Sequence, residues 1–360
     1  MKAMLLHSAP RGELTVENVP DPKCSDDGLI IKMAANGICR SDWHEWNGDW
    51  GWLGIVPYKY PMIPGHEGTG VVAEVGKNVK NWKVGDRVVP PVSVGCGTCP
   101  RCVDWSRHNM CETLRIFGYH IDGLFAEYAH APDADYPGNL MKIPEELTDM
   151  AAIASFGCRY QTAYHGVVSQ GEVKPGDKVA VWGLGGIGLV AVQVAASMGC
   201  YVIGIDIFDE KLELAKKVGA HAVVNAKKTD PVQAVKELTF QFNKQAGANV
   251  SIDALGIGET ALNSVLCLTN RGRHVQIGLS TREENGMVAL PIDVMTAMEL
   301  EWHGTLTMPY PQYGQMMKHV LSGKLHPEQL VTKRVSLEEA PAILKSMTEF
   351  GTFGMEVVEF

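Results

Sequence analysis

The sequence predicts an α/β protein of two domains, a mostly β domain first and a doubly wound parallel sheet second. The chain has 360 residues, 46% of them hydrophobic and 20% charged, which is enough for about two soluble globular domains. Glycine and proline punctuate short, Val-rich segments over roughly the first 150 residues, a pattern typical of β structure. From Lys178 onward, strand-like and helix-like segments alternate, which indicates a parallel sheet with helices on its faces.

The alternation is clearest at its start. KVAVW and YVIGID are β-rich runs, and the segment between them opens on a glycine turn and continues as an apolar helix. Asp209 caps the next predicted helix, DEKLELAKKVG, which ends at Gly219, and AVVNA follows as a third strand. We place the mostly β domain at residues 1–157, the doubly wound domain at 158–306, and a return to the first domain at 307–360.

Composition and charge exclude several classes of function. A net charge of −9 gives no general attraction to nucleic acid or to an anionic membrane. The amino terminus, MKAMLLHSAPRGEL, has too few apolar residues for a secretory signal, and no run of 18 apolar residues occurs. We therefore expect a cytoplasmic protein with no nucleic-acid or membrane partner. In such a protein, nine cysteines indicate metal ligands or free thiols more than disulfides.

A glycine turn between the first strand and helix of the second domain predicts a dinucleotide site. Gly183 permits the tight turn, Gly185 lets a pyrophosphate approach the backbone, and Gly188 lets helix and strand pack closely. The helix then begins at Gly186 and Ile187, where free N–H groups face the phosphates. The alternative is a tight turn that binds no ligand.

Asp206 favours NAD over NADP as the dinucleotide. It ends the second strand, 23 residues after Gly183, where its carboxylate can accept hydrogen bonds from ribose hydroxyls and repel a 2′-phosphate. Ile207 and Phe208 follow, so no adjacent Arg can receive that phosphate. The alternative is a solvent-facing Asp without a ligand.

Two groups of residues have the chemistry of zinc ligands. Four cysteines with spacing C-x2-C-x2-C-x8-C can close a tetrahedral, structural zinc site, with free thiols as the alternative: Cys96, Cys99, Cys102 and Cys111. Cys39, His66 and Cys158 are scattered, but each lies beside a glycine turn. If the fold brings them together, three ligands leave a fourth position open, as in a catalytic zinc site. Taken singly, they are instead buried thiols and a core histidine.

The motifs GICRSDWH, PGHEGTGVVAEVG, GDRVV, CGTCPRC, GYHIDGLFAEY, FGCRYQTAYHG and VWGLGGIGLVAVQ occur in this order. In them the chain resembles the zinc-dependent medium-chain alcohol dehydrogenases over nearly its whole length. The resemblance implies a GroES-like catalytic domain, two zinc ions per chain, NAD, and reversible hydride transfer between a primary or secondary alcohol and the aldehyde or ketone. The short GYHIDGLFAEY segment is similar to the bacterial and yeast branch, which implies a homo-oligomer, a tetramer rather than a dimer.

The resemblance also implies roles for individual residues. Cys39, His66 and Cys158 are the catalytic zinc ligands, and Glu67 can approach the metal during ligand exchange. Asp42 orients His66, while Ser41 and His44 relay the proton. The residues implied at the cofactor are Arg40 at the pyrophosphate, Thr162 at the nicotinamide, Lys211 with Asp206 at the adenosine ribose, and the backbone of Ile277, Gly278 and Leu279 at the carboxamide. For Lys211 the alternative is a solvated helix lysine, and for Thr162 and Arg40 a structural role.

Three features depart from the family pattern. The gap between Cys102 and Cys111 is one residue longer than usual, so the lobe must bulge. Met355 stands where the family often has an Arg that reaches a cofactor phosphate. A long, aromatic-rich loop is expected between Ser41 and His66, with Trp43, Trp46, Trp50, Trp52, Tyr58 and Tyr60. These rings line a cleft for bulky apolar or aryl substrates, or they bury against another subunit.

Two other classes of protein compete with this interpretation. A zinc-free quinone or enoyl reductase would share the glycine turn without needing Cys39, His66 and Cys158. A non-enzymatic zinc protein would use only the four-cysteine lobe. Sorbitol and threonine dehydrogenases usually replace the third ligand by Glu, so Cys158 indicates the alcohol branch.

Overall fold

The computed structural model describes residues 1–103, 105–350 and 352–360, which form two compact units. The first unit comprises 1–161, 307–322 and 331–360, and the second comprises 162–306 and 323–330. Two short segments therefore lie outside the predicted division, because 158–161 belong to the first unit and 323–330 to the second. The second of these is held by Gln193, whose side-chain amide donates to the carbonyl of His326 and accepts from its N–H.

The second unit is built on a six-stranded sheet whose paired strands are all parallel, in the order β12-β11-β10-β13-β14-β15. The strands are β10 (Lys178–Trp182), β11 (Tyr201–Asp206), β12 (Ala222–Asn225), β13 (Ala248–Asp253), β14 (Leu268–Gln276) and β15 (Glu301–Gly304). The strand order reverses between β10 and β13, and ligands of doubly wound sheets bind at such a point. The predicted doubly wound sheet is confirmed.

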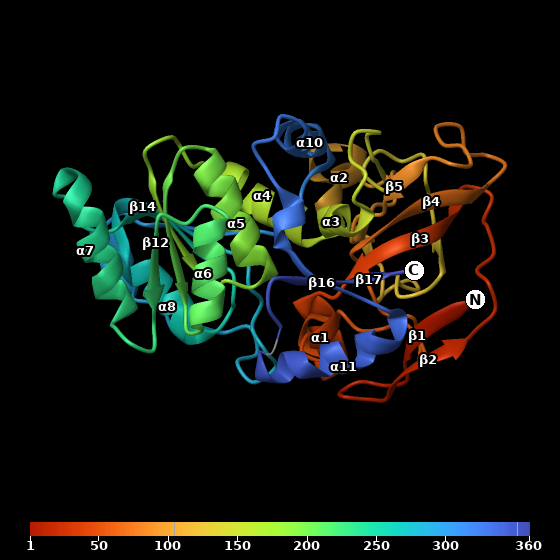
Figure 1. The fold of residues 1–360 in the computed structure, drawn as a ribbon, viewed down its shortest axis with the longest axis horizontal. Helices are drawn as coiled ribbons and strands as arrows, with labels where there is room; N and C mark the ends of the chain where they lie inside the picture. Colours follow the sequence, from red (N-terminus) through yellow and green to blue (C-terminus); the bar gives the residue numbers. More distant parts are fainter. Residues whose placement is uncertain (104, 351) are drawn as a thin grey trace. The chain divides into compact units, whose positions relative to one another are not determined.

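Helices cover the two faces of this sheet in pairs. The chain moves from β10 to β12 through α5 (Gly186–Ser197) and α6 (Asp209–Lys217), then crosses back through α7 (Pro231–Asn243) and α8 (Gly258–Leu266). Right-handed crossovers place α5 and α6 on one face and α7 and α8 on the other (Figure 1).

The predicted N-cap of α6 is wrong by one residue. Phe208 is the N-cap, and the Asp209 carboxylate accepts hydrogen bonds from Asn225 and Lys228 instead.

The first unit is mostly β, as predicted. Its largest sheet has the order β16-β17-β3-β4-β5-β9, with β8 also against β3, and only β16 and β17 pair in parallel. These strands are β3 (Leu29–Gly37), β4 (Gly68–Val75), β5 (Arg87–Val89), β8 (Tyr128–Ala131), β9 (Met141–Lys142), β16 (Val331–Val335) and β17 (Met355–Glu359). Two further pairs are β1 (Lys2–Leu6) with β2 (Leu14–Asn18) and β6 (Ser93–Val94) with β7 (Arg115–Ile116).

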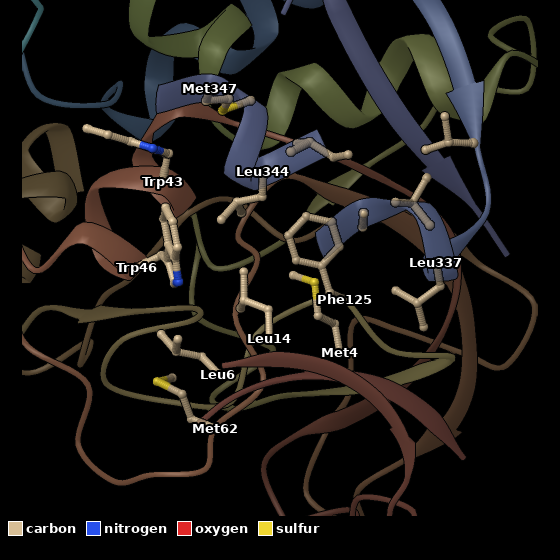
Figure 2. Close-up of a cluster of buried hydrophobic side chains, with 14 residues drawn as sticks. Met4, Leu6, Leu14, Trp43, Trp46, Met62, Phe125, Leu337, Leu344 and Met347 are labelled. Carbon is tan, nitrogen blue, oxygen red and sulfur yellow. The ribbon is translucent and has the colours of Figure 1, made fainter. Parts of the chain in front are cut away.

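Short helices connect these strands, and one of them was expected as a loop. They are α1 (Arg40–Asn47), α2 (Pro100–Val103), α3 (Met150–Ala154), α4 (Arg159–His165), α10 (Tyr313–Leu321) and α11 (Ala340–Ser346), while α9 (Ile292–Ala297) lies in the second unit. In α1, Trp43 and Trp46 are three residues apart and therefore share one face, which packs against β1 and α11 in the core that Figure 2 shows. Among the described residues, no helix combines the length and apolar character needed to span a bilayer.

The aromatic residues after Ser41 thus divide into separate environments. Trp43 and Trp46 belong to the hydrophobic core of their own chain. For these two residues, both predicted locations, the wall of a substrate cleft and a subunit interface, are therefore wrong. Trp50 is buried at the wall of a cavity, whereas Trp52 is 50% exposed in the 3₁₀ helix Gly51–Leu53. Tyr58 and Tyr60 are also exposed.

Candidate active site

The first unit brings Cys39, His66 and Cys158 together. Cys39 is the N-cap of α1, His66 lies just before β4, and Cys158 lies between a 3₁₀ turn and α4. Although they are far apart in the sequence, all three are buried, and two Sγ atoms and one imidazole nitrogen lie within 4.8 Å of one another. Two thiolates and an imidazole suit zinc, and three protein ligands leave one coordination position for another molecule.

His66 and Asp42 have the orientation that such a site needs. Nδ1 of His66 lies 2.8 Å from Oδ1 of Asp42, while Oδ2 of Asp42 accepts a hydrogen bond from the Cys39 N–H. Nε2 of His66 is buried and forms no hydrogen bond with any described residue, as a ring nitrogen aimed at a metal does. Burial opposes protonation of His66, but the charge of Asp42 and its hydrogen bond raise the pKa of His66 well above 6.5.

Glu67 is paired with a residue that sequence reasoning missed. Nε of Arg159 lies 2.9 and 2.7 Å from the two carboxylate oxygens of Glu67, and both side chains are buried. Burial raises the pKa of Glu67 to about 8, against the opposing charge of Arg159. The three-residue ligand group does not include Glu67. The only signal for Arg159 in the sequence is a charge beside Cys158 in an apolar segment.

Ser41 and His44 lie on α1 beside the ligand group. Oγ of Ser41 is 3.8 Å from Sγ of Cys39. The buried ring of His44 stacks on Trp50 with centroids 5.1 Å apart, and its Nδ1 lies 2.6 Å from Oδ2 of Asp49. Burial and the charge of Arg40 lower the pKa of His44 below 6.5, while Asp49 opposes the shift. His44 is therefore a neutral base at neutral pH, and its partner Asp49 was not predicted.

Arg40 has several partners within the first unit. Its guanidinium lies 3.7 Å from the ring centroid of Trp43 and 4.8 Å from that of Phe350, and Nη1 donates a hydrogen bond to the Met347 carbonyl. Burial lowers its pKa to about 10. These contacts give Arg40 a structural role, so contact with a cofactor phosphate would have to compete with them.

Met355 is fully buried at the start of β17.

The four cysteines form a second, closed group. The Sγ atoms of Cys96, Cys99, Cys102 and Cys111 all lie within 4.8 Å of one another. Backbone N–H groups point at these sulfurs, for example from Cys96 to Cys111 at 3.3 Å. Hydrogen bonds from Thr98 lower the pKa of Cys96 to about 5, which favours the thiolate that zinc requires.

The longer gap before Cys111 does not prevent this grouping. It contains the end of α2 and a 3₁₀ segment, Trp105–Met110, that is kinked at Arg107. Asp104, within the expected bulge, lies outside the described residues.

The glycine turn has the predicted backbone geometry. Gly183 has a positive φ of 83°, and a Cβ at Gly188 would lie 1.9 Å from the Gly183 carbonyl oxygen. A Cβ at Gly185 would meet no atom within 4 Å, so space is open before α5, which Gly186 and Ile187 begin. Each glycine therefore has its own reason: Gly183 has a backbone conformation that disfavours other residues, Gly188 has no room for a side chain, and Gly185 borders open space.

Asp206 has a structural role that the sequence did not reveal. Oδ2 accepts a hydrogen bond of 2.7 Å from the Leu184 N–H, inside the glycine turn. Oδ1 accepts from the N–H groups of Ile207 and Phe208. Asp206 therefore holds the turn against the end of β11.

The remaining cofactor candidates also lie in the second unit. Nζ of Lys211 is 5.0 Å from the Phe208 ring centroid, and Thr162 is buried in α4. Ile277 and Gly278 both donate their N–H groups to the Asp253 carbonyl, and Leu279 is partly exposed beyond them. A carboxamide would have to use other backbone groups of this segment.

Comparisons with known proteins agree with this geometry. Residues 25–145 match the alcohol dehydrogenase GroES-like domain, and residues 186–322 match the zinc-binding dehydrogenase family. An alcohol dehydrogenase of Geobacillus stearothermophilus is 33% identical, with 96% of this chain and 95% of the relative covered. An NAD-dependent alcohol dehydrogenase of Sulfurisphaera tokodaii is 31% identical over 99% of both.

A solved structure supports the same assignment over the whole fold. The alcohol dehydrogenase of Aeropyrum pernix superposes with a TM-score of 0.88 at 30% identity and full coverage of both chains. This chain therefore belongs to the zinc-dependent medium-chain alcohol dehydrogenases.

Proposed function

We propose that this protein interconverts alcohols and aldehydes or ketones at a zinc ion held by Cys39, His66 and Cys158, with NAD as hydride carrier. The observation that carries the proposal is the convergence of these three side chains, with Nε2 of His66 left without a hydrogen bond among the described residues. Zinc bound there would act as a Lewis acid toward the alcohol oxygen. The protein is an NAD-dependent alcohol dehydrogenase as a member of its family.

The chain's own residues position the metal ligands and move the proton. Asp42 fixes the ring of His66 and the backbone of Cys39 together. Ser41, beside Cys39, accepts the proton of the alcohol, and His44 passes it on because its ring is neutral. Arg159 keeps the Glu67 carboxyl in place behind the ligands. We assign Glu67 to ligand exchange, which requires that it leave Arg159.

In the second unit, the glycine turn binds the cofactor phosphates. Gly183, Gly185 and Gly188 shape the turn, and Gly186 and Ile187 open α5, whose first N–H groups would bind the phosphates. Asp206 and Lys211 bind the adenosine ribose, which favours NAD. Thr162 and the segment Ile277, Gly278 and Leu279 contact the nicotinamide end.

Metal analysis with a substrate panel tests the proposal. The purified protein is expected to contain two zinc ions per chain, one for each ligand group, and to reduce NAD with primary, secondary or aryl alcohols. A single zinc per chain with no alcohol oxidation would instead support a zinc-free reductase or a non-enzymatic zinc protein.

We further propose a cytoplasmic homo-oligomer, with a tetramer favoured over a dimer. Large apolar side chains are exposed in the segment of the chain between β14 and β15, among them Met287 and Ile292. Exposed apolar side chains of this kind suit a subunit interface. Light scattering after size exclusion measures the mass, and a monomer of 39.2 kDa would contradict this proposal.

A further inference from the structure

A chain of side-chain hydrogen bonds runs through the interior of the second unit, from the end of β10 to the end of β14. Successive side chains are 2.9, 2.7, 2.9 and 3.0 Å apart, and the members in order are Trp182, Ser251, Ser264, His274 and Gln276. Trp182 directly precedes the glycine turn, and Gln276 directly precedes residues 277–279, which we call the nicotinamide segment. The chain therefore joins the two places where the proposed function puts the cofactor.

The last member fixes the direction of the hydrogen bonds before it. The side-chain amide nitrogen of Gln276 donates to the Gly278 carbonyl at 2.8 Å and to Oδ2 of Asp253 at 3.0 Å. Because a carbonyl only accepts, the amide oxygen must face His274, so Nε2 of that ring carries the hydrogen. Burial lowers the pKa of His274 to about 4. The ring is therefore neutral, and its Nδ1 accepts from the Ser264 hydroxyl.

Three backbone groups of the nicotinamide segment are held by these side chains and their neighbours. The N–H groups of Ile277 and Gly278 donate to the Asp253 carbonyl, and the Gly278 carbonyl accepts from Gln276. The Ile277 carbonyl and the Leu279 N–H form no hydrogen bond with any described residue. A carboxamide has one donor group and one acceptor group, and these two backbone groups complement it in kind.

The Asp253 side chain also ties this segment to the turn that follows β13. Its Oδ1 accepts from the N–H groups of Leu255 and Gly256 at 2.9 and 3.1 Å. A Cβ at Gly278 would lie 2.3 Å from the Gly256 nitrogen, so the turn and the segment are in close contact. Gln276 is the link between the buried Asp253 carboxyl and the Gly278 carbonyl.

We propose that Gln276, oriented by His274, is a positioning residue for the nicotinamide end of the cofactor. It holds the Gly278 carbonyl, and so it keeps the Ile277 carbonyl and the Leu279 N–H in one orientation. A preorganised segment spends less of its binding energy on ordering the backbone. The alternative is that the chain of hydrogen bonds only stabilises the second unit. The inference rests on the proposed function, which places NAD in this unit.

Isothermal titration calorimetry with NADH and with ADP-ribose separates the two roles, because ADP-ribose lacks the nicotinamide. Gln276→Met keeps the length of the side chain but removes its donors. NADH affinity should therefore fall by about 3- to 10-fold, while ADP-ribose affinity stays within about twofold.

His274→Phe is a second variant that acts through Gln276. It keeps a ring against Trp302, whose centroid lies 3.9 Å from that of His274, but it no longer orients the amide. We expect a smaller loss of NADH affinity, about 2- to 4-fold, with ADP-ribose again unaffected. The double variant should lose no more than Gln276→Met alone, because the two residues act as one unit.

Gln193→Met is the matched control. Gln193 is also buried in the second unit, and its amide makes two hydrogen bonds to the backbone of His326. This variant should lower the melting temperature about as much as Gln276→Met does. It should leave the ratio of NADH affinity to ADP-ribose affinity within about twofold of the parent's.

The outcomes distinguish this inference from the proposed function. An unchanged NADH affinity in Gln276→Met, an equal loss for both ligands, or a selective loss of NADH in Gln193→Met overturns the inference and leaves the proposed function standing. If Gln276→Met does not fold, the same ratio in His274→Phe decides. A parent that binds neither ligand overturns the proposed cofactor site and, with it, this inference.

Discussion

The first unit contains two groups of metal ligands that differ in how the chain assembles them. Cys96, Cys99, Cys102 and Cys111 come from one short segment, whose own backbone N–H groups surround the sulfurs. The second group, Cys39, His66 and Cys158, comes from the ends of three separate elements. Asp42 contacts His66, and Arg159, next to Cys158, pairs with Glu67, next to His66. The first group is closed and local, whereas the second is open and depends on the tertiary fold. Metal loss should therefore affect folding at one group and chemistry at the other.

The largest effect is expected at the open group. Cys39→Ala and His66→Ala should each lower alcohol oxidation by about 1,000-fold or more, because the position that polarises the alcohol loses a ligand. Metal analysis should show one zinc lost per chain, and the circular dichroism spectrum should be that of the parent. Full activity in either variant contradicts the assignment of these ligands.

At the closed group, loss of a ligand should lower stability and leave the reaction rate nearly unchanged. Cys99→Ala removes one of four ligands, so we expect a melting temperature lower by roughly 5–10 °C and a smaller soluble yield. The rate per folded, zinc-loaded molecule should change less than threefold, since this metal takes no part in the reaction. As a matched control, Cys24→Ala changes a cysteine that lies outside both groups. A Cys99→Ala protein as stable as the control contradicts a structural zinc.

The same contrast explains what the sequence could and could not predict. The four-cysteine lobe, the glycine turn and the strands around that turn can be predicted from residues that lie close together in the sequence. The structure contains all three features. Arg159 and Asp49 were missed because their importance comes from burial and from partners that the fold supplies. The helix α1 was missed because only Trp43 and Trp46 mark its apolar face, which is too few for a periodic pattern.

A smaller effect is expected at Asp206, where binding and structure overlap. Asp206→Gly should raise kcat/KM for NADP relative to NAD by about 10- to 100-fold, because the repulsion of a 2′-phosphate is removed. The substitution also removes the hydrogen bond to the Leu184 N–H, so overall affinity should fall. Asp206→Asn retains an acceptor for that N–H and separates the two effects. An unchanged cofactor ratio in both variants places the determinant elsewhere.

An effect of similar size but confined to lower pH, and the one that most sharpens the comparison, is expected at His44, which lies beside the open group without being a ligand. Burial and Arg40 lower the pKa of His44 below 6.5 against the opposing effect of Asp49, so the ring is neutral above that pKa and charged below it. If His44 receives the proton, kcat/KM should rise as pH passes upward through this lowered pKa.

His44→Gln should then slow oxidation by about 10- to 100-fold below pH ~8, with partial recovery at high pH or in imidazole buffer. Asp49→Asn should lower the pH at which His44 becomes neutral, because Asp49 raises the pKa of His44, and it should also lower stability, because the buried ring loses its charged partner. The alternative is that His44 serves only to stack on Trp50 and bond Asp49. In that case His44→Gln would lose activity by the same factor at every pH, and imidazole would restore none of it.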